Sequence, residues 1–385
     1  MHSRYADPTV AKIWSSGQRV QRWLLIERAH LRVLGWDASI KHYDTPIHYE
    51  VNAAEARTGH DVGAFLEVLE QRLVHPQAQR WLHYGLTSSD LVDTGNAMAA
   101  NETTGYLATL AATLRKAFDT IPDGLVVQGR THGQPAAATT VRGRWRPVEE
   151  GLFHNLPDPL PAMFSGAVGQ HCILSRRTEK EIADVLGMRA VDASTQVIPR
   201  SEFHRVLYRW LEWIQACEQI ALDVRLMSAF GDCNEPRQGV GSTAMPHKVN
   251  PIRAEKICGL ARVARGLFHA ELEGAALWLD RDLSHSSVDR IAFEDLGHLA
   301  AHALSQTTTL LRTLEWHPQP LTPEADSAHR LALATKSFDW PRSVAYRWVR
   351  DGVGADSGAK EVTPESVAAT PAPRPRVPFD GGTPE

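Results

Sequence analysis

The chain has 385 residues, 43% of them hydrophobic, so it is long enough to bury a large core and to form more than one domain. Its 41 basic and 45 acidic residues give a net charge of −4, which argues against nucleic acid as a partner, because nucleic-acid-binding domains are usually basic. No run of about 18 apolar residues occurs, so neither a transmembrane helix nor a membrane partner is expected.

The cysteines and the N-terminus both indicate a cytoplasmic protein. The four cysteines lie far apart and show no C-x-x-C spacing, so neither a zinc site nor a disulfide framework is expected; they are Cys172, Cys217, Cys233 and Cys258. The first residues lack the apolar segment of a signal peptide. A reducing cytoplasm is the simplest location for such a chain.

Most of the chain has the apolar period of helices, with apolar residues recurring at three- and four-residue steps. In chain order we expect helices over about 20–34, 61–74, 88–118, 202–229, 251–267 and 291–314. Gly35 is a plausible end of the first, and Ser88 or Ser89 is expected to cap the third. No convincing period-two strand occurs. The predicted fold class is therefore all-α, a bundle of long helices.

Two stretches interrupt this pattern. Residues 156–161 read Leu-Pro-Asp-Pro-Leu-Pro, and three prolines at alternate positions cannot lie inside a helix. Residues 363–385 contain six prolines and no apolar period, so we expect a tail without fixed structure.

The loop at 241–251 reads Gly-Ser-Thr-Ala-Met-Pro-His-Lys-Val-Asn-Pro and is the most informative segment for function. Asn250 suits an N-cap and Pro251 a first helical position. Ser242 and Lys248 should then lie at the positive end of a helix, which is suited to holding an anion. A Gly-Ser-Thr turn alone would be read as a flexible turn.

Three further segments narrow this interpretation. They are His83-Tyr-Gly-Leu-Thr-Ser-Ser-Asp90, Gly129-Arg-Thr-His-Gly-Gln-Pro-Ala136 and Arg281-Asp-Leu-Ser-His-Ser-Ser-Val-Asp-Arg290. Together with the 241–251 loop they resemble, in the same order, the motifs of the adenylosuccinate lyase branch of the fumarase/aspartase superfamily. The resemblance covers about residues 1–310.

The resemblance implies a long-helix bundle that assembles as a homotetramer, with each active site built from three subunits and with no metal or organic cofactor. It implies an N-terminal helical domain over 1–95, a central bundle over 96–310, and a reduced C-terminal helical domain over 311–362. The family's long helix after Thr140 is shortened here by the prolines at 156–161.

The implied reaction is elimination of fumarate from a succinylated purine nucleotide. The family converts adenylosuccinate to AMP and also cleaves the succinyl carboxamide imidazole nucleotide of purine synthesis. Such a reaction needs a base, an acid for the departing nitrogen, and fixed positive groups. Ser242 matches the family's base and His132 its acid. Lys248 and Asn250 match carboxylate contacts, as do the neighbours of the acid, which are Thr131 and Gln134.

The remaining matches are supporting residues. His60 matches a histidine that supports the acid, although it can equally be a helix cap. His83, Thr87 and Ser88 match substrate contacts, although residues 87–90 are also typical of a helix start. Phosphate contacts are implied for the residues Arg4, Tyr5, Ser286 and Arg290, and a weaker match gives a substrate contact to Gln196. Ser286 and Arg290 are four residues apart and would share a helix face.

Two other interpretations stay open. A lyase for a different succinyl adduct in specialised metabolism would have the same base and acid. A catalytically inactive structural or regulatory relative is suggested by the proline-rich segment at 156–161 and by the reduced third domain.

Overall fold

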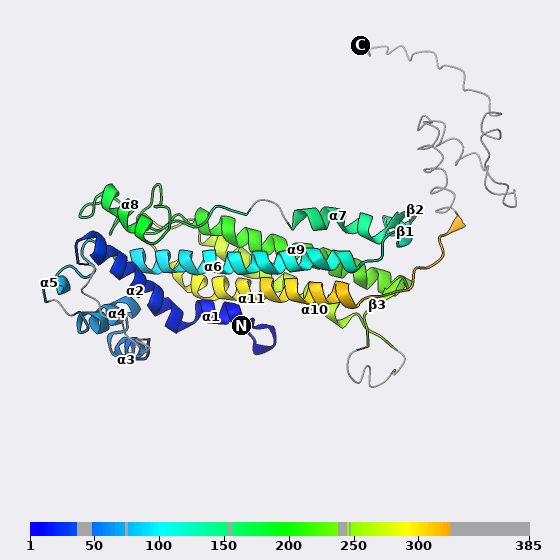
Figure 1. Cartoon of the computed structure of the whole chain (residues 1–385), viewed down its shortest axis with the longest axis horizontal. Coiled ribbons are helices and arrows are strands. Elements are labelled where there is room, and N and C mark those ends of the chain that lie inside the picture. Colours follow the sequence, from blue (N-terminus) through cyan, green and yellow to red (C-terminus); the bar gives the residue numbers. More distant parts are fainter. Residues whose placement is uncertain (37–47, 74–75, 153–155, 238–244, 246–247, 324–385) are drawn as a thin grey trace, which may run out of the picture. The chain divides into compact units, whose positions relative to one another are not determined.

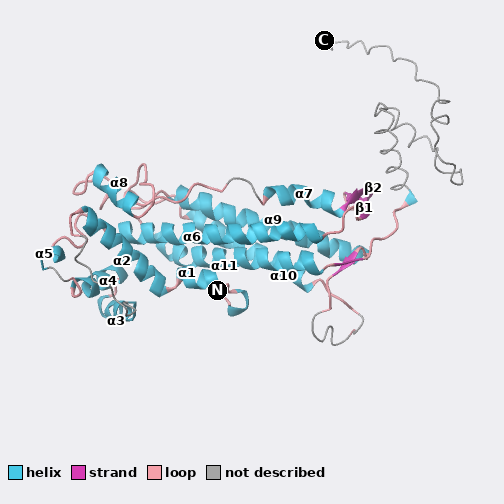
Figure 2. Cartoon of the chain, in the orientation of Figure 1, coloured by secondary structure: helices cyan, strands magenta, loops and turns pink. Residues whose placement is uncertain are grey.

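The structure is a computed structural model that describes residues 1–36, 48–73, 76–152, 156–237, 245 and 248–323. Two compact units are distinguished: residues 1–127 with 140–319, and residues 128–139 with 320–385. Helices dominate the first unit (Figures 1 and 2), so the predicted all-α class is confirmed. The helices are η1 Ser3–Tyr5, α1 Pro8–Trp14, α2 Ser16–Val33, α3 His48–Thr58, α4 Asp61–Glu70, α5 Pro76–Gln79, α6 Ser88–Ala117, η3 Phe118–Thr120, α7 Val141–Gly151, α8 Arg176–Val185, α9 Arg200–Phe230, α10 Ile252–Glu273 and α11 Ser284–Thr313.

Four long helices, α6, α9, α10 and α11, pack along one another and enclose the main core (Figure 1). Their apolar stripes meet at side chains that are almost completely buried, among them Trp210 and Trp213 of α9 and Phe293 of α11. The indole of Trp210 also donates a hydrogen bond of 2.9 Å to Thr104 of α6. The three-to-four-residue period in the sequence therefore marks the faces that close this bundle.

A second cluster of buried side chains joins α2 and α4 to the first turn of α6 and to the segment around α8. Trp23 of α2 and Phe65 of α4 meet edge to face there, with ring centroids 5.7 Å apart. This cluster fixes the starts of α4 and α6 relative to each other, and both starts contain predicted site residues.

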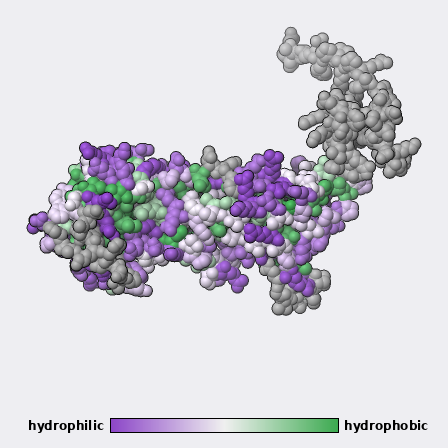
Figure 3. Space-filling model, in the orientation of Figure 1, coloured by the Kyte–Doolittle hydropathy of each residue, from purple (hydrophilic) through white to green (hydrophobic). Residues whose placement is uncertain are grey.

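The proline-rich segment interrupts a helix, as predicted. Helix α7 ends at Gly151, and residues 156–161 are not helical. The side chains of α7 are largely charged, and Figure 3 shows a strongly hydrophilic surface over this helix. Leu160, within the segment, and Ala162, just after it, are nevertheless buried, and Ala162 forms a parallel β-bridge with Ala190.

Short strands occur where we expected none. β1 (Val126–Thr131) and β2 (Gln134–Thr140) form a two-stranded sheet, and β3 (Cys233–Asn234) pairs antiparallel with β4 (Glu315–Trp316). His132 and Gly133, which join β1 to β2, both have positive φ, the arrangement of a two-residue hairpin turn. The alanines and proline of β2 have low strand propensity, which is why the period test missed it.

Two helix starts differ from the prediction. The N-cap of α6 is Thr87, not Ser88 or Ser89, and its N–H donates to Asp90 at 2.8 Å. Pro251, not Asn250, is the N-cap of α10. The buried carboxylate of Glu235 accepts from the N–H groups of Arg253 and Ala254, at 3.0 and 2.8 Å. This start of α10 therefore already holds an anion from its own chain.

Several predictions fall outside the described residues, among them those for Ser242 and for the C-terminal segment from residue 324 onward. The division into four domains therefore stays a prediction. All four cysteines are described, and each is a free thiol. Among the described helices, none is long and apolar enough to cross a membrane.

Candidate active site

A cavity of about 340 Å³ lies where α4, α6 and α11 begin. Four residues predicted from three separate segments line it, namely His60, Ser88, Ser286 and Arg290. They come together because the cores described above join these three helix starts. The cavity is strongly polar, and its other lining side chains include Arg19, Glu55, Asp61, Asp93, Asn96, Arg281, His285 and Asp289.

His60 caps α4. Its Nδ1 accepts a hydrogen bond of 3.0 Å from the N–H of Gly63, so Nδ1 is not protonated and the neutral ring has its proton on Nε2. The side chain is 56% exposed. The cap and the site contact are therefore compatible, because capping uses one ring nitrogen and leaves the other free to act.

Ser286 and Arg290 share one face of α11 and both line the cavity, as their spacing predicts. The guanidinium of Arg290 lies 3.3 Å from the carboxylate of Asp61 and is 62% exposed. Asp61 therefore pairs with Arg290, while the His60 ring is farther away, at 3.8 Å. A bound anion would compete with Asp61 for this guanidinium.

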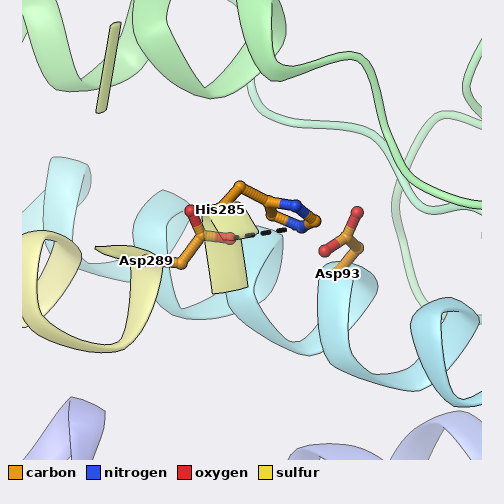
Figure 4. Close-up of side chains that lie close together, drawn as sticks. All are labelled: Asp93, His285 and Asp289. Carbon is orange, nitrogen blue, oxygen red and sulfur yellow. Dashed lines mark ion pairs between the residues drawn. The ribbon is translucent and has the colours of Figure 1, made fainter. Parts of the chain in front are cut away.

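Part of the cavity wall is a buried group of charged residues. Asp93, His285 and Asp289 bring their ligand-type atoms within 4.8 Å of one another, a geometry that a metal ion could use (Figure 4). However, the buried guanidinium of Arg200 binds Asp93 and also lies 3.0 Å from Asp289. Arg200 thus occupies the position of a cation, and we interpret the group as an ion-pair network.

His285 is neutral in this network. Burial, followed by the nearby charge of Arg200, lowers the pKa of His285 to about 4. Arg281 lies 3.2 Å from its Nε2, and because arginine only donates, Nε2 must accept. The network thereby holds Arg281 at the cavity wall.

A carboxyl group of this network is protonated near neutral pH. Glu271 of α10 lies beside Asp289, and the two share a hydrogen bond. Burial first, and then the charge of Asp289, raise the pKa of Glu271 well above its ordinary value. The folded state therefore binds a proton that the unfolded chain has already released.

This shift predicts a dependence of stability on pH. Glu271 stabilises the fold fully below its ordinary pKa, and this stabilisation is lost as the pH rises through the raised folded-state pKa. We expect Glu271→Gln, which retains a hydrogen-bond donor but cannot ionise, to lose less unfolding free energy than the wild type between about pH 5 and about pH 9. Urea unfolding at several pH values measures this.

The control is Glu273→Gln, a change on the same helix at a side chain that is 76% exposed. It should follow the wild-type curve. A Glu271→Gln curve parallel to that of the wild type would contradict the protonated state.

Two more predicted residues lie close to the cavity. Thr87 immediately precedes Ser88, at the start of α6. The N–H of Gln196 donates to the carbonyl of Asp280, next to the cavity residue Arg281, and the Gln196 side chain donates to the Ala167 carbonyl at 2.9 Å. His83, the first residue of the 83–90 motif, contacts the buried carboxylate of Glu27.

A second group of predicted residues lies elsewhere in the same unit. Lys248 and Asn250 line a separate cavity of about 530 Å³ with Arg225 of α9 and Glu255 of α10. This cavity is at the start of α10, whereas Ser286 follows the end of α10. The 22 residues of α10 span roughly 33 Å at 1.5 Å per residue, so one chain cannot bring the two cavities together.

Arg4 and Tyr5 also lie away from the first cavity. The Tyr5 ring meets His302 of α11 edge to face at 5.4 Å, and His302 is 16 residues from Ser286, roughly 24 Å along a helix. Burial first, and then the charge of Lys256, lower the pKa of His302. Because Lys256 is close to the start of α10, the contact between Tyr5 and His302 lies near that end of the helix. Arg4 is exposed beside it.

Thr131, His132 and Gln134 are exposed on the β1–β2 hairpin. They belong to the second unit, and His132 takes the first positive-φ position of the turn. The hairpin presents its predicted acid at a tight turn, flanked on each side by a predicted carboxylate contact. Ser242, the predicted base, lies outside the described residues.

The sequence interpretation missed some cavity residues. Arg281 belongs to the 281–290 motif, but its residue type alone gave it no role in the site. Asp93 lies just beyond the 83–90 motif. Arg19 offers no local signal, because its place over the ring of Trp23, 5.3 Å from the centroid, depends on the packing of α2.

The chain is similar to known proteins over most of its length. The model of a lyase family matches residues 24–266. Adenylosuccinate lyase of Deinococcus radiodurans is 30% identical over 87% of this chain and 83% of its own length, and that of Archaeoglobus fulgidus is 32% identical over 79% and 73%. The crystal structure of fumarate lyase from Mesorhizobium sp. BNC1 shares the fold, with a TM-score of 0.71 and 19% identity over 93% of this chain and 89% of that one. The chain is therefore a lyase and belongs to the adenylosuccinate lyase family of the fumarase/aspartase superfamily.

Proposed function

We propose that this lyase cleaves the C–N bond of adenylosuccinate to give AMP and fumarate, and that it also acts on the succinyl carboxamide imidazole nucleotide. One observation supports this most directly. The polar cavity at the starts of α4, α6 and α11 collects a histidine, two serines and an arginine from three motifs. The relatives named adenylosuccinate lyase support the same substrate.

In the proposed reaction the oxygen base of Ser242 removes a proton from the carbon next to a succinyl carboxylate. The electron pair forms the double bond of fumarate as the C–N bond breaks, and His132 returns a proton to the departing nitrogen. Lys248 and Asn250, with the hairpin residues Thr131 and Gln134, would hold the carboxylates.

The other groups have supporting roles. Arg290 and Ser286, with Arg4 and Tyr5, would bind the phosphate, because guanidinium groups fork onto phosphate oxygens. His60, whose Nε2 remains available, would support the acid. His83, Thr87, Ser88 and Gln196 would contact the substrate. No step in this scheme uses a metal or an organic cofactor.

We also propose a cytoplasmic homotetramer with shared active sites. Its support is the separation within one chain: the cavity with Lys248 and the cavity with Arg290 are held apart by the length of α10. A complete site would then need a second copy to bring the start of its α10 to the first cavity of its neighbour.

An assay tests the activity. Purified tetrameric protein mixed with adenylosuccinate should release fumarate and AMP, followed by ultraviolet absorbance. A tetramer without turnover would favour the inactive relative, and turnover confined to another succinyl adduct would favour the specialised lyase.

Arg290→Met separates phosphate recognition from the rest of the site. Loss of a charged hydrogen bond costs about 1.5–3 kcal/mol, so the KM for adenylosuccinate should rise about 10- to 100-fold. The dephosphorylated nucleoside is the control substrate, and its KM should change little. An unchanged KM for adenylosuccinate would rule out the nucleotide assignment of this arginine.

A further inference from the structure

A buried glutamate holds one of the predicted substrate contacts. Glu27 of α2 is fully buried and lies 56 residues before His83. One Glu27 oxygen is 2.7 Å from Nδ1 of the His83 ring, and the other accepts from the His83 backbone N–H at 3.1 Å. A single carboxylate therefore fixes both the ring and the backbone of His83.

The charge on Glu27 settles which nitrogen of His83 bears a proton. Burial alone would raise the pKa of Glu27, but the nearby rings of His30, 3.7 Å away, and of His83, which is hydrogen-bonded, outweigh burial and lower the pKa to about 2. Glu27 is thus an ionised carboxylate that can only accept. Nδ1 of His83 must donate to it, and Nε2 is left on the opposite side of a ring that is 18% exposed.

Hydrogen bonds also fix the backbone at and next to His83. His83 has a φ of 57°, a left-handed conformation that is uncommon for a residue with a side chain and needs surrounding contacts to persist. The hydrogen bond from the His83 N–H to Glu27 supplies one such contact. His30 of α2 supplies another, because its Nε2 donates to the carbonyl of Tyr84 at 3.0 Å. Four residues later the chain reaches Thr87 and the start of α6.

We propose that Glu27 is a positioning residue that holds the His83 ring with Nδ1–H bound internally and Nε2 available to an anionic group of the substrate. This rests on the proposed function, in which His83 contacts the succinylated nucleotide. In the complex the ring then lies between two negative groups, with Nδ1–H donating to Glu27 and Nε2–H donating to a substrate oxygen. Glu27 itself touches no substrate.

The chain provides a matched control. Glu179 of α8 is also fully buried, and it lies 2.7 Å from Nε2 of His171, whose φ is 52°. It accepts a further hydrogen bond from Phe164. Removal of its charge disturbs a similar buried arrangement, but no site role is assigned to His171.

The test compares Glu27→Gln with Glu179→Gln. An amide turns an NH₂ group toward one of the two His83 donors, so the ring loses its fixed orientation. For Glu27→Gln we expect a KM for adenylosuccinate about 10- to 100-fold higher, with kcat within about threefold of wild type. Both variants should lower the free energy of unfolding by similar amounts, but Glu179→Gln should leave KM unchanged. An equal rise of KM in both variants would show that Glu27 is merely structural.

A spectroscopic measurement does not depend on turnover. In ¹⁵N spectra of histidine-labelled protein, Nδ1 of His83 should be protonated in the wild type and lose this preference in Glu27→Gln. An unchanged His83 signal would overturn the positioning role, whereas a wild type inactive on adenylosuccinate would contradict the proposed function. If the glutamine variant fails to fold, Glu27→Asp, which retains the charge but not the reach, is expected to show the same spectral change and the same rise in KM.

Discussion

Replacing Ser242 with alanine is expected to lower kcat for fumarate release by about 10²- to 10⁴-fold, the range that a positioned acid or base contributes. The hydroxyl is the proposed base, and alanine can accept no proton. The substrate should still bind, since its carboxylates and phosphate are held by other groups. KM for adenylosuccinate, and the free energy of unfolding in urea, should therefore change little.

Replacing the proposed acid, His132, should lower kcat as strongly as replacing Ser242. His132→Gln removes the group that protonates the departing nitrogen, and kcat should fall within the same range. His132 lies in an exposed turn with a φ of 54°, so His132→Asn, which tolerates this conformation better, is the companion variant and should be equally inactive. Steady-state kinetics over a range of pH measure both.

Thr243→Ala is the control for the base, because it removes the neighbouring hydroxyl of the same loop. It should retain most of the wild-type kcat. Wild-type rates in Ser242→Ala or in His132→Gln would refute the roles that we assign to them.

The second large effect is recovery of activity when two inactive variants are mixed. If Ser242 and His132 of one site come from different chains, a hybrid tetramer contains some sites with both groups intact. Equal, random mixing of Ser242→Ala and His132→Gln should restore about a quarter of wild-type activity. The reason is geometric, because the described residues of one chain already place predicted contacts in two cavities separated by the length of α10.

The matched control mixes Ser242→Ala with the double variant, which provides no intact Ser242 and should stay inactive. Differently tagged chains, followed by native mass spectrometry, establish that hybrids form. Hybrids with no more activity than their parents would contradict sharing of sites between chains.

Much of the local structure follows directly from the sequence. The apolar period depends only on residues three and four apart, and it located both ends of α9 and the end of α11 to within two residues, although α11 begins seven residues before the predicted start. The prolines at 156–161 end a helix wherever they occur, because they lack an N–H donor. The motifs also gave the family, since four short segments in the right order are specific without any knowledge of their contacts.

The partners of these motifs were decided by the tertiary structure. Glu235 fills the start of α10 although it lies 18 residues before Arg253, so no local rule could prefer it over Asn250. The contacts of Glu27 with His83 and of Arg200 with Asp93 cross 56 and 107 residues. Hydrogen-bond energy falls off within a few ångströms, so such pairs exist only after the helices have packed. The sequence alone therefore determined where the helices run and which motifs the chain carries. The packing of the helices decided which buried charged residues contact those motifs.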